Sequence, residues 1–160
     1  MSHTSTISRV RIMDIDALRA AINELSESGT PVHMEEGGTP RAYYQNQEGL
    51  GPAENVIRLG GGCPYDIGVY PAADGRGHEL RSDLFLDRVA EVVGVDPSPF
   101  IRDDMTPEER VQVAGQASMG RIYQRYAVVA SEREAARQGH STQRVLEDDG
   151  EMSLRVGLAA

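Results

Sequence analysis

The residues that could assemble a reactive centre are few. The chain has one cysteine, Cys63, which directly follows three glycines. A thiol nucleophile needs a histidine base and a group that orients this base. If the fold combined Cys63 with His78 and Asp66, the result would be a small enzyme with a cysteine nucleophile. One cysteine in an intracellular protein is more often inert, so this site is an alternative hypothesis.

The spacing of the other candidate ligands argues against metal and phosphate sites. No histidine lies three or four residues from another, so no helical pair of metal ligands exists. His33-Met34-Glu35 matches half of a zinc-deaminase motif, but the other half requires two cysteines. The three glycines at 60–62 precede Pro64 and a predicted strand, which favours a turn over a phosphate-binding loop. We therefore predict no metal and no cofactor.

Aromatic and basic side chains could instead form a recognition surface. Arg41, Tyr43 and Tyr44 lie close together, and arginines with aromatic rings are typical of single-strand nucleic-acid binders. The alternative is core packing, because six tyrosines and two phenylalanines without any tryptophan must supply the aromatic part of the core. We expect Tyr65 and Tyr126 in the core. The sequence does not decide whether Tyr43 and Tyr44 belong to the core or to a binding site.

The composition disfavours several further functions. The chain has 160 residues and a formal net charge of −9, and all 16 of its basic side chains are arginines. The lack of lysine excludes Schiff-base and Walker-type chemistry. An acidic total disfavours nucleic-acid binding, although a local arginine patch would escape this argument. One cysteine excludes an internal disulfide, and no apolar run is long enough for a membrane span. We expect a cytoplasmic protein.

The spacing of apolar residues predicts the elements that must position these side chains. Alternation and β-forming residues predict strands at 4–12, 30–35, 41–45, 55–59, 65–70 and 78–84. Helical spacing predicts one helix over residues 17–25, with Asp14 as its N-cap and Gly29 as its end, and another over 84–93.

Residues 106–138 predict the longest helical region. Thr106 can cap it, Pro107 suits the first helical position, and Glu109 completes a capping box. Gly115 and Gly120 weaken the helix, so the sequence leaves open whether it is one helix or two. Residues 142–146 and 152–158 predict a terminal hairpin around an Asp-Gly turn.

This order of elements predicts the fold class. We expect an α+β fold, with a mostly antiparallel sheet, two or three helices on one face and a C-terminal β-hairpin. The length predicts a single domain over residues 1–160, with loops or linkers at 46–54 and 95–106.

Several short motifs, in order, also carry a family resemblance. They are Asp16-Ala17-Leu18, Tyr65-Asp66-Ile67-Gly68-Val69, Asp74-Gly75, Tyr123-Gln124-Arg125-Tyr126-Ala127, Ala135-Ala136-Arg137-Gln138-Gly139 and Asp149-Gly150. In these motifs the chain resembles the plastid reading-frame 35 family (domain of unknown function 1257) of cyanobacteria, plastids, other bacteria and bacteriophages. The resemblance implies a small intracellular α+β protein, is consistent with a bacteriophage origin, and supplies no catalytic residue. Residues 40–64 and 96–106 and Thr4 depart from the family pattern.

These observations together favour a non-enzymatic binding or accessory protein. We expect it to act through contact with a protein partner, as a bacterial or phage-encoded adaptor. The arginines of the 106–138 region are the positive feature behind this hypothesis. The candidate binding residues are Arg41, Tyr43, Tyr44, Arg121 and Arg125. The enzyme with Cys63, His78 and Asp66 and the single-strand nucleic-acid module remain alternatives.

Overall fold

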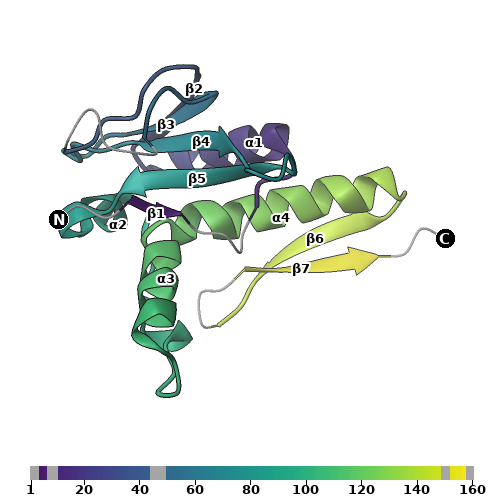
Figure 1. The fold of residues 1–160 in the computed structure, drawn as a ribbon. Helices are drawn as coiled ribbons and strands as arrows, with labels where there is room; N and C mark the ends of the chain where they lie inside the picture. The colour runs from purple at the N-terminus through teal and green to yellow at the C-terminus, as the bar shows by residue number, and fades with distance from the viewer. Residues whose placement is uncertain (1–3, 7–10, 44–49, 149–151, 158–160) are drawn as a thin grey trace.

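The computed structural model describes residues 4–6, 11–43, 50–148 and 152–157. It contains a five-stranded sheet, four α-helices and a separate two-stranded hairpin near the C-terminus (Figure 1). All strand pairs are antiparallel. The predicted α+β fold class is therefore confirmed.

The strands of the large sheet follow the order β1-β5-β4-β3-β2. Their bounds are Thr4–Thr6 for β1, Val32–Glu36 for β2, Asn55–Leu59 for β3, Ile67–Pro71 for β4 and His78–Asp83 for β5. The predicted strand at 4–12 is seen as β1 and as an isolated bridge between Ile12 and His78; residues 7–10 lie outside the described part.

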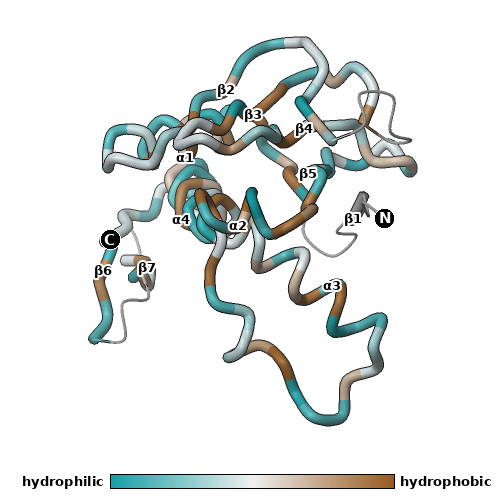
Figure 2. The backbone as a smooth tube through the Cα atoms, turned by 90° about the vertical axis from the view of Figure 1, so that its left-hand side faces the viewer, coloured by the Kyte–Doolittle hydropathy of each residue, from teal (hydrophilic) through white to brown (hydrophobic). Residues whose placement is uncertain are grey.

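Three helices cover one face of this sheet, as Figure 2 shows. They are α1 (Ile15–Glu27), α2 (Arg88–Val93) and α4 (Gly120–Arg137). The α1 helix begins as predicted, because the Asp14 side chain accepts a hydrogen bond from the Ala17 amide. Alternate residues of the strands pack with these helices in one core, which includes Leu18, Ile22, Ile57, Ile67, Leu80, Val89 and Ile122.

The predicted helix at 84–93 is too long at its start. The α2 helix begins only at Arg88, after a 3-10 turn, η1 (Phe85–Asp87). Within this turn Leu86 and Asp87 have φ values of 56° and 55°. Such left-handed residues cannot continue a right-handed helix, and apolar spacing does not reveal them.

The long helical region is two helices. The capping box of Thr106 and Glu109 starts α3 (Pro107–Ser118) as predicted, and Met119 separates it from α4. Gly120 is packed so closely that a Cβ atom there would lie 2.4 Å from Val95 Cγ2. The chain therefore turns where a glycine permits the backbone to approach a neighbouring side chain. As Figure 2 shows, α3 projects away from the sheet.

The terminal hairpin consists of β6 (Ser141–Leu146) and β7 (Met152–Gly157). Arg144 ties it to two helices, because its guanidinium donates to the carboxylates of Glu24 on α1 and Glu132 on α4. In the region 95–106 the structure has one short 3-10 turn, η2 (Ser98–Phe100).

The second face of the sheet carries polar side chains, and the described residues 37–43 and 50–54 between β2 and β3 lie against it. A small apolar cluster of Leu50, Ala53, Val56 and Tyr70 holds the end of this segment. The predicted strand at 41–45 is wrong for its described part, since residues 41–43 have no strand pairing. Their main-chain groups bond to the ends of strands, and two of the acceptors are buried carboxylates.

Candidate functional site

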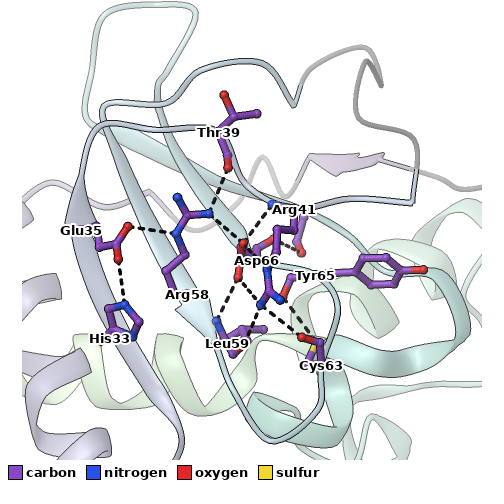
Figure 3. A network of polar contacts seen from close by, with 10 residues as sticks. His33, Glu35, Thr39, Arg41, Arg58, Leu59, Cys63, Tyr65 and Asp66 are labelled. Atoms are coloured by element: carbon purple, nitrogen blue, oxygen red, sulfur yellow. Dashed lines mark hydrogen bonds and ion pairs between the residues drawn. The ribbon is translucent and has the colours of Figure 1, made fainter.

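Asp66 is the centre of a polar network between the sheet and the segment that follows β2 (Figure 3). Its side chain is completely buried immediately before β4. The carboxylate accepts from the main-chain N–H, Nε and Nη2 of Arg41, from Nη1 of Arg58 and from the Leu59 amide, at 2.9 to 3.1 Å. Five donors therefore satisfy both carboxylate oxygens.

The two arginines extend this network to carbonyl groups and to a second carboxylate. Arg41 Nη2 donates to the carbonyl oxygens of Leu59 and Cys63. Arg58 donates to the Thr39 carbonyl and to Glu35, which also contacts His33 Nε2 at 3.0 Å. The bond from Arg58 to Thr39 and the bonds from Arg41 to Asp66 together fix the path of this segment over the sheet.

Asp83 binds the same segment at Tyr43, two residues after Arg41. This second completely buried carboxylate ends β5 and accepts hydrogen bonds from the amides of Tyr43 and Phe85, at 2.9 and 3.0 Å. The backbone at residues 41–43 is thus fixed by Asp66 at one end and by Asp83 at the other. The Tyr43 and Phe85 rings are in contact, with centroids 5.3 Å apart.

Hydrogen bonding keeps Asp66 ionised in spite of its burial. Burial by itself would raise the pKa of this carboxyl, but the donors from Arg41, Leu59 and Arg58 outweigh it and hold the pKa below its ordinary value. An ionised carboxylate accepts stronger hydrogen bonds than a neutral one. The charge of Asp66 therefore helps to orient Arg41.

Three exposed residues and the half-buried Phe85 form a surface close to these carboxylates, which we call the Tyr43 surface: Arg41, Tyr43, Phe85 and Leu86. The side chain of Arg41 is 51% exposed, Tyr43 is 57% exposed and Leu86 is 69% exposed. Tyrosine and arginine are enriched among the residues that dominate protein interfaces. The structure thus displays residues of this kind on a backbone that buried groups hold in place.

Leu86 occupies an unfavourable conformation on this surface. Its φ of 56° and ψ of 27° place it in the left-handed region, and Asp87 follows in the same region. Residues other than glycine and asparagine are rare there, and such strain is concentrated at functional sites. The conformation holds an apolar side chain in solvent, beside Phe85 and its contact with Tyr43.

The structure does not bring together the three residues of the enzyme hypothesis. His78 pairs with Pro71 at the far end of β4, about 16 Å along the strand from Asp66. His78 Nε2 contacts Glu54 instead, at 2.7 Å. Cys63 is buried, and its thiol donates to the Tyr65 carbonyl. Burial raises the pKa of this thiol, so the fraction present as reactive thiolate is small.

The arginines of α4 mostly contact other parts of the same chain. Arg125 pairs with Glu24, and Arg133 and Arg137 both pair with Asp14. These contacts connect α4 to α1. Arg121 donates to the Thr30 hydroxyl and the Val92 carbonyl. Arg121 and Arg125 still line a groove on the outer side of α4, far along the chain from Arg41 and Tyr43.

The remaining tyrosines separate into two groups. Tyr65 and Tyr126 are buried, as expected, and the Tyr126 hydroxyl accepts from the amides of Met13 and Asp14. Tyr44 lies outside the described residues.

Sequence reasoning missed Asp83, Phe85 and Leu86, because its indicators were apolar spacing and motifs. The one sequence feature that could have indicated a role for Asp83 is its place at the end of a predicted strand, where an aspartate can accept hydrogen bonds from nearby main-chain amides.

The described residues contain neither a cluster of metal ligands nor a membrane-spanning helix. No three side chains among histidine, cysteine, aspartate and glutamate in this part of the chain lie close enough to bind a metal ion. No helix in the same part has the length and apolar character required to cross a membrane.

Comparisons of the chain with protein-family models, curated proteins and solved structures give no match. They do not bear on the resemblance to the plastid reading-frame 35 family, which stays a prediction from the sequence motifs.

Proposed function

We propose that this protein is a non-enzymatic binding protein that recognises another protein through the Tyr43 surface. One observation carries the proposal: the two completely buried carboxylates, Asp66 and Asp83, both bind the short segment that displays Arg41 and Tyr43. A buried ionic network is weak evidence for stability, since a well-packed apolar replacement is often as stable. Its clear effect here is to fix the geometry of an exposed segment.

Such fixed geometry favours binding. An interface loses affinity when loops and side chains must be ordered on contact, and a surface held before binding avoids part of that cost. Arg41 is oriented by the Asp66 carboxylate, and Tyr43 is supported by the Phe85 ring. The exposed Leu86 adds apolar area beside them.

A protein partner fits this surface better than a single-stranded nucleic acid. Arg41 pairs with Asp66, so part of its charge is neutralised inside the protein. Nucleic-acid affinity depends mainly on unneutralised basic charge, and the whole chain carries a net charge of −9. We place the protein in the cytoplasm of a bacterial or phage-infected cell, as the family resemblance implies.

The proposal can be tested by affinity capture with quantitative mass spectrometry, from a lysate of the native host. The baits are the wild type, Tyr43→Ala, Leu86→Asn, and Met13→Ala as a control that removes an exposed apolar side chain elsewhere. We expect the wild type and Met13→Ala to retain the same partner. Tyr43→Ala should reduce its recovery about tenfold or more, the effect of losing a dominant interface residue, and Leu86→Asn should reduce its recovery by a smaller factor, through lost apolar contact.

Two results would overturn the proposal: a reproducible lack of any partner, or equal recovery on all four baits. A parallel titration with labelled single-stranded DNA and RNA tests the alternative. We expect no binding at low salt. Binding by the wild type that Tyr43→Ala abolishes, and that weakens steeply with added salt, would replace the protein partner with a nucleic acid.

A further inference from the structure

Two adjoining hollows lie along the outer side of α4, between α3 and the hairpin, and together we call them the α4 groove. They have volumes of about 370 and 260 Å³, and Phe100 and Gln124 line both of them. The larger hollow by itself falls in the range of about 300 to 1,000 Å³ that is typical of small-molecule sites. The groove therefore has room for a small organic ligand.

One end of the groove is mainly apolar. Besides the two shared residues, the smaller hollow is lined by Val95, Val113, Gln116, Ala117, Gly120 and Tyr123. Phe100 is 48% exposed, so the wall that it forms is partly open to water in the free protein. An apolar chain that entered this hollow would remove its own surface and part of the wall from water, which is favourable.

The other end of the groove is basic. Besides the two shared residues, the larger hollow is lined by two arginines and four apolar residues: Arg121, Arg125, Leu25, Ala127, Val128 and Met152. Arg121 is exposed, and its guanidinium donates to the Thr30 hydroxyl and the Val92 carbonyl, which are both neutral. A guanidinium has five N–H donors, so these two bonds leave donors and the whole positive charge available to a ligand.

The charges around this basic end do not cancel. Arg125 and Arg144 both pair with Glu24, and Arg144 also pairs with Glu132. Arg121 has no carboxylate partner within the described part of the chain, where its bonds are to neutral groups. Three arginines thus face two carboxylates, and the positive charge in excess lies beside the larger hollow.

The acidic character of the whole chain does not exclude an anionic ligand. The net charge is −9, but exposed charges are largely screened beyond about 8 Å at physiological ionic strength. Glu91 lines a neighbouring hollow together with Arg121, but its carboxylate lies 3.5 Å from Arg88 Nε and pairs with that arginine. The local excess of positive charge therefore determines which sign of ligand charge the groove prefers.

We propose that the α4 groove binds a small amphipathic carboxylate, which is a molecule with one carboxylate group on an apolar chain. The carboxylate lies beside Arg121, because a guanidinium matches the geometry of a carboxylate. The chain extends past Phe100 and Gln124 into the smaller hollow. The groove follows α4 from Gly120 to Val128, a rise of about 12 Å along the helix axis. No residue of the Tyr43 surface lines the groove, so the inference is independent of the proposed function.

A series of ligands tests both ends of the groove. The dissociation constants are measured by NMR titration of the labelled full chain, whose amide shifts also locate the site. From hexanoate to octanoate to decanoate, affinity should rise about threefold to fourfold for each methylene that is buried. Octan-1-ol has no charge and octyltrimethylammonium has the opposite charge. We expect octanoate to bind about tenfold more tightly than either, the effect of a hydrogen-bonded charge.

Variants separate the two ends. Arg121→Gln should weaken octanoate about tenfold and leave octan-1-ol unchanged, because it removes only the charge. Arg19→Gln is its control, since Arg19 lies outside the groove and contacts Glu36. Phe100→Ala should weaken octanoate and octan-1-ol by the same factor, because it removes an apolar wall. Val111→Ala changes an exposed residue of α3 that does not line the groove, and it should weaken neither ligand.

Any of three findings would contradict the proposal. They are the absence of saturable shifts with all three carboxylates, equal affinity of the wild type for octanoate and octan-1-ol, and unchanged octanoate binding in folded Arg121→Gln. The NMR spectrum of each variant shows whether it is folded.

Two further measurements separate this ligand from other partners. Phosphatidylglycerol vesicles test a lipid surface, and a protein that sediments with them but gives no saturable shifts with octanoate would replace the small ligand with a membrane. Tyr43→Ala should bind octanoate as the wild type does. If octanoate does not bind while capture of a protein partner still depends on Tyr43, the ligand is excluded and the Tyr43 surface stands.

Discussion

Three nitrogens of Arg41 donate to the carboxylate of Asp66, each at a distance of 2.9 Å. One belongs to the main chain and two to the guanidinium, so the single carboxylate fixes both the backbone and the direction of the side chain. Asp66 is completely buried, whereas half of the Arg41 side chain is exposed. The contact thus joins a buried anchor to a residue that can meet a partner.

Asp66→Asn should destabilise the fold by about 3 kcal/mol, because it leaves two guanidinium groups without their shared carboxylate. Urea denaturation of both proteins at neutral pH measures the effect. Asp74→Asn is the matched control, since Asp74 pairs with Arg11 at the exposed surface. The control should keep the wild-type midpoint. Equal midpoints for Asp66→Asn and the wild type would show that the network has no stabilising role.

The same carboxylate should make stability depend on acid pH. Its pKa in the folded protein lies below its ordinary value, which is about 3.9 in an unfolded chain. The resulting stabilisation is present above that value and is lost as the pH falls below about 4. The stability difference between wild type and Asp66→Asn should therefore shrink as denaturation is measured from neutral pH to about pH 3. A difference that stays constant would contradict the assigned pKa direction.

Leu86→Asn should increase stability while it weakens binding. The left-handed conformation is costly for leucine and better tolerated by asparagine, and the exposed leucine side chain loses little packing. We expect a gain of up to about 1 kcal/mol in the free energy of unfolding, measured by thermal or urea denaturation. A second change, Met13→Asn, controls for the loss of an exposed apolar group. A loss of stability with Leu86→Asn would show that the side chain is needed for packing.

Arg144→Gln should release the hairpin without unfolding the core. The guanidinium makes four hydrogen bonds to Glu24 and Glu132, and these are ion pairs between the hairpin and helices α1 and α4. Hydrogen exchange of the β6 and β7 amides should become about tenfold faster, because local opening costs less once the contact is lost. The exposed neighbour Gln143, changed to alanine, should leave the rates unaltered. Equally slow exchange in Arg144→Gln would mean that other contacts hold the hairpin.

The Cys63 thiol should resist labelling in the folded protein. The residue is 4% exposed, and burial raises the pKa of its thiol. A thiol reagent such as DTNB should react with the native chain about a hundredfold more slowly than with the chain in denaturant. The rate of DTNB with glutathione, measured with and without denaturant, corrects for the effect of the denaturant on the reagent itself. Rapid labelling of the native protein would restore the hypothesis of a catalytic cysteine.

Local signals in the sequence were sufficient for much of the fold. Asp14 before Ala17-Leu18 correctly predicted the start of α1, and Thr106 with Glu109 correctly predicted the start of α3. Caps are contacts within one turn, so a few neighbouring residues specify them. The alternation of Ile67 and Val69 with their neighbours likewise indicated β4.

The predictions from the sequence are wrong where a distant contact determines the conformation of the backbone. Residues 41–43 contain β-forming tyrosine, but their amides bond to Asp66 and Asp83 across the sheet instead of to another strand. Leu86 has helical spacing with Val89 and yet lies in a left-handed turn. In both places tertiary contacts override local preference.

The sequence by itself determined the class of fold and narrowed the chemistry, because composition, caps and apolar spacing depend on side-chain type and near neighbours. Only the tertiary structure decided which polar residues meet. It separated His78 from Asp66, placed the α4 arginines against α1, and brought Arg41 to a carboxylate twenty-five residues away. The physical reason is that a buried charge must find hydrogen-bond partners wherever the fold supplies them, and chain order does not reveal those partners.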